Sequence, residues 1–163
     1  MLRGVMLLGL VVLSGCRGGL AGGIFTRDGI SYRVVEPSGP WQRRDFEDND
    51  LAWLAPTGHV IAINSTCSGH EDPQLDVLTN HLVMGFTDRQ WVSKTKFQLD
   101  GREAMRSLVK AKLDGVPTSL DLVVLKKNGC VHDFSYISPE GQEAAHQAEF
   151  DALVAGFRQE HAP

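Results

Sequence analysis

The residues best suited to chemistry are Cys67 and His70, in the sequence Cys-Ser-Gly-His. A histidine close to a cysteine can accept the thiol proton and produce a thiolate nucleophile. No Cys-x-x-Cys pair and no cysteine-protease signature surrounds them, so a Cys67/His70 enzyme is a minor alternative. The same two residues and two further histidines would supply four metal ligands, but their spacing matches no common zinc pattern. The two further histidines are His59 and His81.

Another cysteine, Cys16, ends an N-terminal segment that resembles a bacterial lipoprotein signal. Arg3 supplies the positive charge, and residues 5–13 form an apolar run that is too short to span a bilayer. The run ends in Leu-Ser-Gly-Cys, which resembles a lipobox. An ordinary secreted protein, or a cytosolic protein with an apolar start, would not explain a cysteine at this position. We therefore expect residues 1–15 to be a signal peptide and Cys16 to carry acyl chains that hold the protein on a membrane.

The residues after Cys16 indicate where the anchored protein resides. Position 17 is arginine, whereas by resemblance to enterobacterial sorting an aspartate there would favour retention in the inner membrane. We therefore expect the protein on the periplasmic face of the outer membrane. The glycine-rich residues 16–29 are expected to form a flexible tether. Residues 30–158 are then one globular domain, and residues 159–163 are a short C-terminal tail.

Once Cys16 is lipidated, Cys67 and Cys130 remain as an even pair in an oxidising compartment. Such a pair is typical of a disulfide. Both cysteines lie at the ends of predicted strands, and neighbouring strands would bring them within bonding distance. The opposite arrangement, with the two cysteines at different ends of the sheet, would prevent the bond.

A partner-binding surface is expected at Trp41, Arg43 and Arg44, since Trp and Arg are frequent anchors of protein interfaces. The loop that contains His70 and Glu71 is the second place to look for such contacts. The structural alternative is a loop in which Trp41 is tucked into the edge of the core.

Three Asx-Gly pairs divide residues 91–138 at equal intervals. Such pairs are the strongest short signal of a β-hairpin, because a two-residue type I′ turn needs positive φ at both positions. We therefore predict a four-stranded antiparallel meander. Its strands are residues 91–99, 102–113, 116–127 and 130–138.

Two-residue turns fix the register of this meander. One face then carries Val92 and Val109 side by side, and Trp91 lies on the other face. Both faces carry apolar rows, so both need a cover. Arg106 and Asp121 fall diagonally on one face and are expected to pair. A structural ion pair at a margin of the sheet is favoured over a catalytic role.

The remaining elements complete an α+β fold. A strand starts at Ile30, and a β-hairpin is expected at residues 51–67. Asp72-Pro73 is typical of the start of a helix, and Ser138-Pro139 is expected to start a second helix in the same way. With one helix on each face, the hairpin and meander would form an α/β/α sandwich.

Size and charge limit the function classes further. The chain has 163 residues, enough for one domain with a true core. Its formal net charge is −4, and its isoelectric point is about 5.8, so nothing favours nucleic acid as a partner. Walker A, GxGxxG, GxSxG and HExxH motifs are absent from the sequence, so no cofactor is expected.

The order of these elements resembles the PsbP family, whose fold is shared by the Mog class of Ran-binding import factors. The resemblance rests on that order, on Pro40-Trp41 and on the C-terminal Val154-x-x-Phe157. Within the group, Cys67 and the pattern Cys130…Asp133-Phe134-x-Tyr136 are similar to uncharacterised bacterial lipoproteins. The resemblance implies an antiparallel sheet between helices and a non-enzymatic accessory or binding module. It transfers no functional residues.

Together these features predict a lipid-anchored accessory protein of the bacterial envelope that faces the periplasm and docks onto another envelope protein. Its membrane contact would be the lipid on Cys16. The alternatives are a binder of a small ligand or metal and, less favoured, an enzyme that uses Cys67 and His70.

Overall fold

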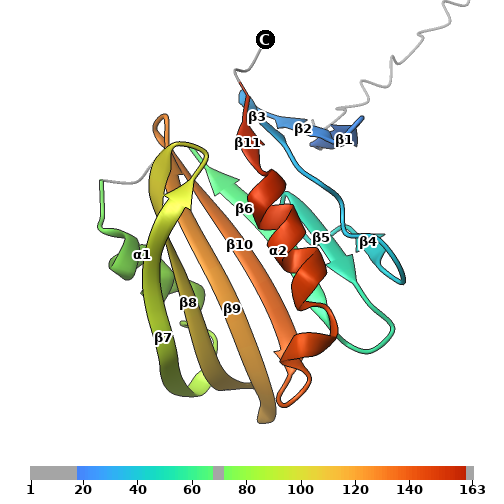
Figure 1. Ribbon diagram of the computed structural model, residues 1–163, viewed down its shortest axis with the longest axis vertical. Helices are drawn as coiled ribbons and strands as arrows, with labels where there is room; N and C mark the ends of the chain where they lie inside the picture. The colour runs from blue at the N-terminus through green and yellow to red at the C-terminus, as the bar shows by residue number, and fades with distance from the viewer. Residues whose placement is uncertain (1–17, 68–71, 161–163) are drawn as a thin grey trace, which may run out of the picture.

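The computed structural model describes residues 18–67 and 72–160. The expected signal peptide, Cys16, His70 and Glu71 lie outside the described residues. The fold is α+β, mostly antiparallel sheets with two helices, as predicted. The main sheet has the strand order β4-β5-β6-β10-β9-β8-β7 (Figure 1). Its strands are β4 (Gln42–Arg44), β5 (Leu51–Leu54), β6 (Val60–Thr66), β7 (Thr87–Leu99), β8 (Arg102–Leu113), β9 (Val116–Lys127) and β10 (Cys130–Pro139).

The predicted meander is confirmed by strands β7 to β10. At each of its three turns the Asx residue has φ between 48° and 50° and the glycine has φ between 76° and 82°. A glycine adopts this conformation without steric cost, which explains why the hairpins form there. The predicted register holds throughout β8–β9 and β9–β10, as in the pairs Val109–Leu120 and Phe134–Val123.

The register prediction is wrong in the outer half of β7. Two irregularities, after Thr87 and after Trp91, insert extra residues into this edge strand. Trp91 therefore pairs with Val109, and Ser93 pairs with Leu108. Since a bulge reverses the alternation of side chains, Trp91 joins the face that was expected for Val92.

The N-terminal region also differs from the prediction. Residues 16–29 were expected to be a flexible tether, but within the described part β1 (Gly19–Ala21) and β2 (Ile24–Arg27) form a second antiparallel sheet with β3 (Ile30–Arg33) and β11 (Arg158–Gln159). The β2–β3 turn is a fourth Asx-Gly pair, Asp28-Gly29, with φ of 47° and 81°. Strand β11 also includes Gln159, the first residue of the expected C-terminal tail.

Both helices start later than their cap signals predicted. Helix α1 (Leu75–Leu82) starts after Gln74, and Asp72 forms an ion pair with Lys126. Residues Ser138 and Pro139 continue strand β10, where they pair with β9. A short 3-10 helix, η1 (Glu143–Ala145), follows, and then helix α2 (Gln147–Gly156).

Two apolar clusters cover the two faces of the main sheet. Helix α2 buries Phe150 and Leu153 in one cluster with Val123 and Phe134 of the sheet. On the opposite face, Leu82 of α1 packs on a smaller cluster that includes Val109 and Leu120. Figure 1 shows α2 in front of the sheet and α1 behind it. In the described ranges no helix combines the length and apolar character needed to cross a membrane.

Candidate binding site

A pocket of about 230 Å³ opens on the α2 side of the main sheet. It lies where β8, β9 and β10 meet the turn and the short helix that precede α2. Apolar and polar groups both line it. The lining comprises Val92, Leu108, Val109, Lys110, Ser119, Leu120, Asp121, Tyr136, Ser138, Glu143 and Gln147.

The pocket exists because α2 covers only part of this face. The helix contacts β10, and the outer strands β8 and β7 lie farther from it in the sheet (Figure 1). The bulge in β7 places Val92 beside Leu108 at the pocket, and their exposed fractions are 59% and 38%. Exposed apolar side chains that gather in a concavity are typical of a binding surface.

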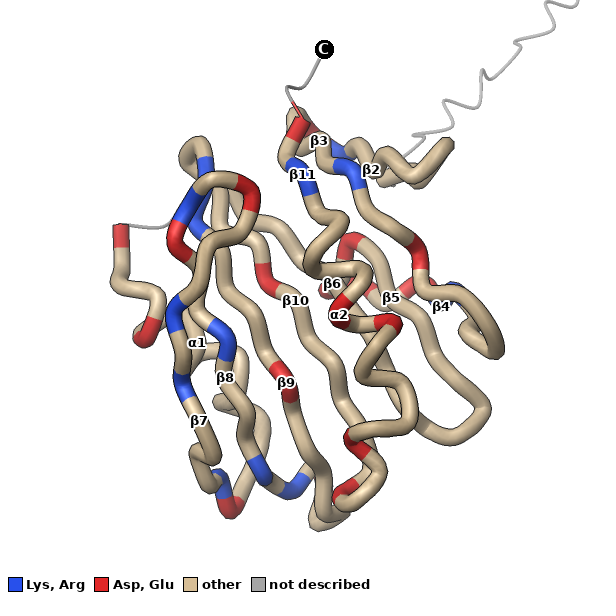
Figure 2. Tube along the Cα trace, viewed as in Figure 1, with Lys and Arg blue, Asp and Glu red and all other residues tan. Residues whose placement is uncertain are grey.

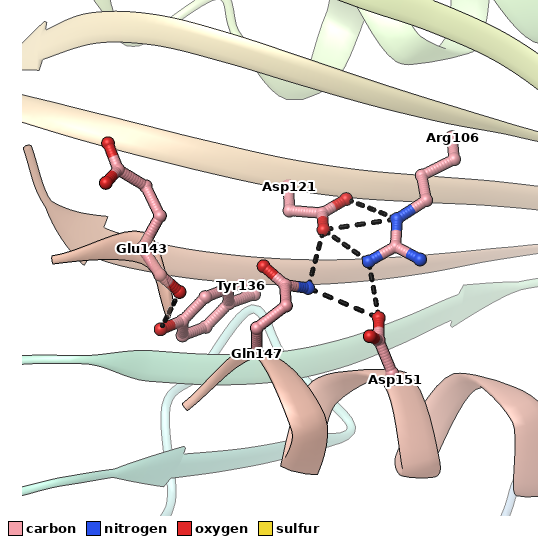
Figure 3. A network of polar contacts seen from close by, with 6 residues as sticks. All are labelled: Arg106, Asp121, Tyr136, Glu143, Gln147 and Asp151. Atoms are coloured by element: carbon pink, nitrogen blue, oxygen red, sulfur yellow. Dashed lines mark hydrogen bonds and ion pairs between the residues drawn. The ribbon is translucent and has the colours of Figure 1, made fainter. Parts of the chain in front are cut away.

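A polar network forms one wall of the pocket and joins the sheet to α2. The Arg106 guanidinium donates to Asp121 from Nε at 2.9 Å and from Nη2 at 2.5 Å (Figure 3). The same Nη2 also contacts Asp151 of α2 at 2.5 Å. Gln147 donates to Asp121 at 2.9 Å and to Asp151 at 3.2 Å. The predicted Arg106–Asp121 pair is confirmed, but it lies beneath a helix rather than at a sheet margin.

This network is suited to holding a wall in place. Asp121 is buried, and it accepts three hydrogen bonds from Arg106 and one from Gln147. The pKa of Arg106 is raised, mainly by its hydrogen bond to Asp121, and Arg106 therefore keeps its proton. Arg106 is therefore not suited to exchanging a proton with a ligand at neutral pH.

A second set of contacts fixes the turn at the pocket mouth. The Tyr136 hydroxyl donates to the backbone carbonyl of Glu143 at 3.0 Å (Figure 3). Ser119 donates to the Glu143 carboxylate at 2.5 Å, and the Gly141 amide donates to it at 3.0 Å. His59 Nε2 donates to the carbonyl of Gln142 at 3.1 Å. The pocket therefore has a defined shape without a ligand, which lowers the entropic cost of binding.

The charges around the pocket are segregated. Figure 2 shows cations mainly on β7 and β8, and carboxylates on α2 and on the turn before it. Residues 140–156 contain no lysine or arginine. Two ion pairs cross between the sides, Arg106–Asp151 and Lys110–Glu140.

The predicted disulfide is confirmed. Cys67 follows β6, Cys130 starts β10, and their sulfur atoms are bonded at 2.03 Å. These two strands are neighbours in the sheet, with Val131 opposite Thr66. In this state Cys67 offers no thiolate for the Cys67/His70 chemistry, and His70 lies outside the described residues.

The three predicted partner-binding residues that the structure describes do not line the pocket. Trp41 is half-buried against the core, with its ring 5.0 Å from that of His146, as the structural alternative predicted. Arg43 and Arg44 are exposed on β4. Their role in partner binding, and that of His70 and Glu71, stays a prediction.

The histidines considered as metal ligands lie in different environments. His59 is buried and hydrogen-bonded through both ring nitrogens, to Thr57 and to Gln142. His81 is exposed on α1. In residues 18–67 and 72–160, no three histidine, cysteine or acidic side chains are grouped as metal ligands would be.

Sequence reasoning did not identify Tyr136, Glu143, Gln147 or Asp151 as site residues. Gln147 and Asp151 are one helical turn apart and therefore point to the same side of α2. That spacing was the available signal, but it does not reveal which strands the helix crosses.

A buried carboxyl group lies on the other face of the sheet. Asp133 is placed between Val124 and Asn64 on the neighbouring strands. Among the described residues its Oδ1 atom has no hydrogen-bond partner. Burial raises its pKa from 3.8 to about 7. Since the folded protein binds this proton more tightly than the unfolded chain, the resulting stability is present below about pH 4 and lost by about pH 7.

We expect the Asp133→Asn variant to have the same free energy of unfolding as the wild type at pH 4. At pH 8 we expect it to be more stable by about 2 kcal/mol, which is less than the full pKa shift would give because the side chain keeps partial solvent contact. Urea unfolding of both proteins from pH 4 to pH 8 measures this difference. The difference curve is needed because burial lowers the pKa of His132 to about 4, which acts in the opposite direction over the same range. A difference that does not change with pH would contradict the prediction.

No protein-family profile matches the chain, and no curated protein matches its sequence. Solved structures do match its fold. LpqN of Mycobacterium tuberculosis, described as involved in cell envelope biogenesis, has 11% identity and a TM-score of 0.60, over 90% of each chain.

Two further structures agree with this match. Cyanobacterial PsbP from Synechocystis has 11% identity and a TM-score of 0.54, over 96% of this chain and 99% of the other. A point mutant of Mog1 has 13% identity and a TM-score of 0.57, over 88% of this chain and 95% of the other. The fold is therefore PsbP/Mog-like, as the resemblance implied.

Proposed function

We propose that this protein is a lipid-anchored accessory protein of the bacterial envelope that binds a partner protein in the pocket on the α2 side of its sheet. The observation that carries the proposal is the uncovered face, with Val92 and Leu108 exposed beside a preformed pocket. The lipobox-like segment that ends in Cys16 supports the anchor, and Arg17 supports the periplasmic face of the outer membrane. LpqN, which shares the fold, is described as involved in cell envelope biogenesis.

A binding role fits the chemistry of the pocket better than catalysis. Arg106 and Asp121 satisfy one another, and the Ser119 hydroxyl donates to the Glu143 carboxylate, whose lowered pKa makes it a weak base for activating a hydroxyl. The alternative of a small-molecule site is less favoured, because about 230 Å³ is below the usual range of ligand pockets, about 300–1,000 Å³.

The proposal is tested by placing the photo-crosslinking residue p-benzoyl-phenylalanine at Val92 in the native bacterium. After irradiation we expect one main covalent adduct, whose partner is identified by mass spectrometry as an envelope protein. The reason is that Val92 lies at the rim of the pocket and would be covered by a bound partner.

Val116 is the matched control, because it is a similarly exposed valine, at 61%, at the start of β9 and does not line the pocket. The Cys16→Ser variant should leave the membrane fraction and lose most of the adduct. Equal crosslinking from Val92 and Val116, or none from either, would contradict the docking proposal. A Cys16→Ser protein that stays on the membrane would contradict the anchor.

A further inference from the structure

One carboxylate at the pocket keeps a charge that no ion pair offsets in the described part of the chain. Asp121 is paired with Arg106, and Lys110 is paired with Glu140. Glu143 lines the pocket, and its hydrogen bonds come from two neutral groups, the Ser119 hydroxyl and the Gly141 amide. The pocket therefore offers an anionic group to a bound partner.

The hydrogen bonds of Glu143 hold it in the ionised form. The pKa of this carboxyl group lies below its usual value. The hydrogen bond from Ser119 is the largest cause, and the bond from Gly141 acts in the same direction. Both bonds go to the same oxygen, Oε1. In residues 18–67 and 72–160 no hydrogen bond to the second oxygen, Oε2, is found, so this oxygen can accept one from a partner. A cationic donor gives a stronger bond than a neutral one.

The size and walls of the pocket indicate what accompanies the cation. A volume of about 230 Å³ holds one large side chain rather than a whole cofactor. Val92 and Leu108 supply apolar contacts, and burial raises the pKa of the Tyr136 hydroxyl, which keeps the ring neutral. An apolar side chain in the pocket would remove this exposed surface from water.

We infer that the pocket receives an extended segment of a partner protein in which a large apolar side chain is adjacent to a lysine or arginine. The apolar side chain fills the space between Val92 and Leu108, and the cation binds Glu143. An acidic segment is disfavoured, since the side of the pocket formed by residues 140–156 carries carboxylates and no lysine or arginine, and the lining residue Lys110 is already paired with Glu140. This inference rests on the proposed function and adds the chemistry of the partner.

The test uses the full mature lipoprotein in a non-ionic detergent and three short peptides. The first is acetyl-Lys-Leu-Lys-amide, with photo-reactive leucine at its centre. The second peptide replaces both lysines by glutamate and keeps the photo-reactive leucine. The third replaces the central residue by glycine and therefore has no photo-reactive group. Fluorescence anisotropy of labelled versions measures affinity, and mass spectrometry maps the photo-adducts of the two leucine peptides.

We expect the lysine–leucine peptide to bind most tightly and to form its adduct at Val92 or Leu108. Glu143→Gln should weaken this binding about tenfold, the effect of losing one charge-assisted bond. Glu103→Gln is the matched control, because it removes the same charge from a residue that is paired with Lys96, and neither of these two residues lines the pocket. It should change the affinity less than twofold.

Two results would overturn the inference: equal binding of the lysine and glutamate peptides, or an equal effect of Glu143→Gln and Glu103→Gln. An adduct outside the pocket, or no binding by any peptide, would also overturn it. These failures are distinguishable from failure of the proposed function. If Val92 still crosslinks to an envelope protein in cells, the docking surface stands and only the cationic, apolar chemistry is wrong.

Discussion

Loss of the Cys67–Cys130 disulfide is expected to lower the free energy of unfolding by about 4 kcal/mol in the chain-entropy description. The two cysteines are separated by 63 positions, so the bond closes a long loop in the unfolded chain. That loop includes α1 and three strands of the meander. Without the bond, the unfolded state gains conformational freedom, whereas β6 and β10 remain paired by their backbone hydrogen bonds in the folded state.

The measurement is equilibrium urea unfolding of the Cys67→Ala/Cys130→Ala double variant, with Cys16→Ser in all samples so that no other thiol is present. Reductant added to the protein with the bond should reproduce the loss. It should leave the double variant unchanged, which makes this variant its own control. A loss below about 1 kcal/mol would show that the unfolded chain is already compact, and the entropic account would then fail here.

Hairpins were the most predictable part of this fold. Each Asx-Gly pair specifies a turn through two adjacent residues, so the register of β8–β9 and β9–β10 follows from local chemistry. The pair Asp28-Gly29 carries the same signal and forms the same turn. It was missed because the glycines around it suggested a tether. The number of glycines in this region suggests a flexible tether, whereas the position of Gly29 directly after Asp28 indicates a hairpin turn.

Irregularities in β7 were not predictable in the same way. A bulge adds one residue without changing composition, and edge strands tolerate it because one side has no neighbour. The consequence is large, since the bulge exchanges the faces of Trp91 and Val92. The candidate site depends on that exchange, because Val92 would otherwise lie on the α1 side.

The helix starts show a conflict between local and distant contacts. Asp72 and Ser138 each precede proline and carry a capping side chain, so local chemistry favoured a helix at both. In the folded chain Asp72 pairs with Lys126, and Ser138 pairs with β9 as part of a long strand. Contacts with distant residues cannot be derived from a window of ten residues, and they decide the outcome here.

The site combines one pair that was predictable with partners that were not. Arg106 and Asp121 are neighbours across a hairpin, so their contact follows from the register. Gln147 and Asp151 come from α2, and the contact between Arg106 and Asp151 spans 45 positions. Its existence depends on the direction in which α2 crosses the sheet, which the sequence does not specify.

The second large expected effect is the loss of stability when Arg106, the ion-pair partner of the buried Asp121, is replaced. Replacing Arg106 by alanine removes the only cation that contacts Asp121 within residues 18–67 and 72–160, and the Asp121 side chain is only 5% exposed. An uncompensated buried carboxylate is expensive, and breaking such a pair typically costs about 3–5 kcal/mol. We expect about 3 kcal/mol, at the lower end, because the Arg106 side chain is 30% exposed and water can enter when it is removed. Thermal and urea unfolding of the variant measure this loss.

Two variants separate the cost of a stranded charge from the loss of a contact. Asp151→Asn breaks the other ion pair of Arg106, but Asp151 is 49% exposed and should contribute less than about 1 kcal/mol. The double variant Arg106→Leu/Asp121→Leu removes both buried charges and should recover most of the stability. If Arg106→Ala costs no more than Asp151→Asn, the network does not fix the wall of the pocket. If the double variant is as unstable as Arg106→Ala, the hydrogen bonds rather than the stranded charge hold α2 on the sheet.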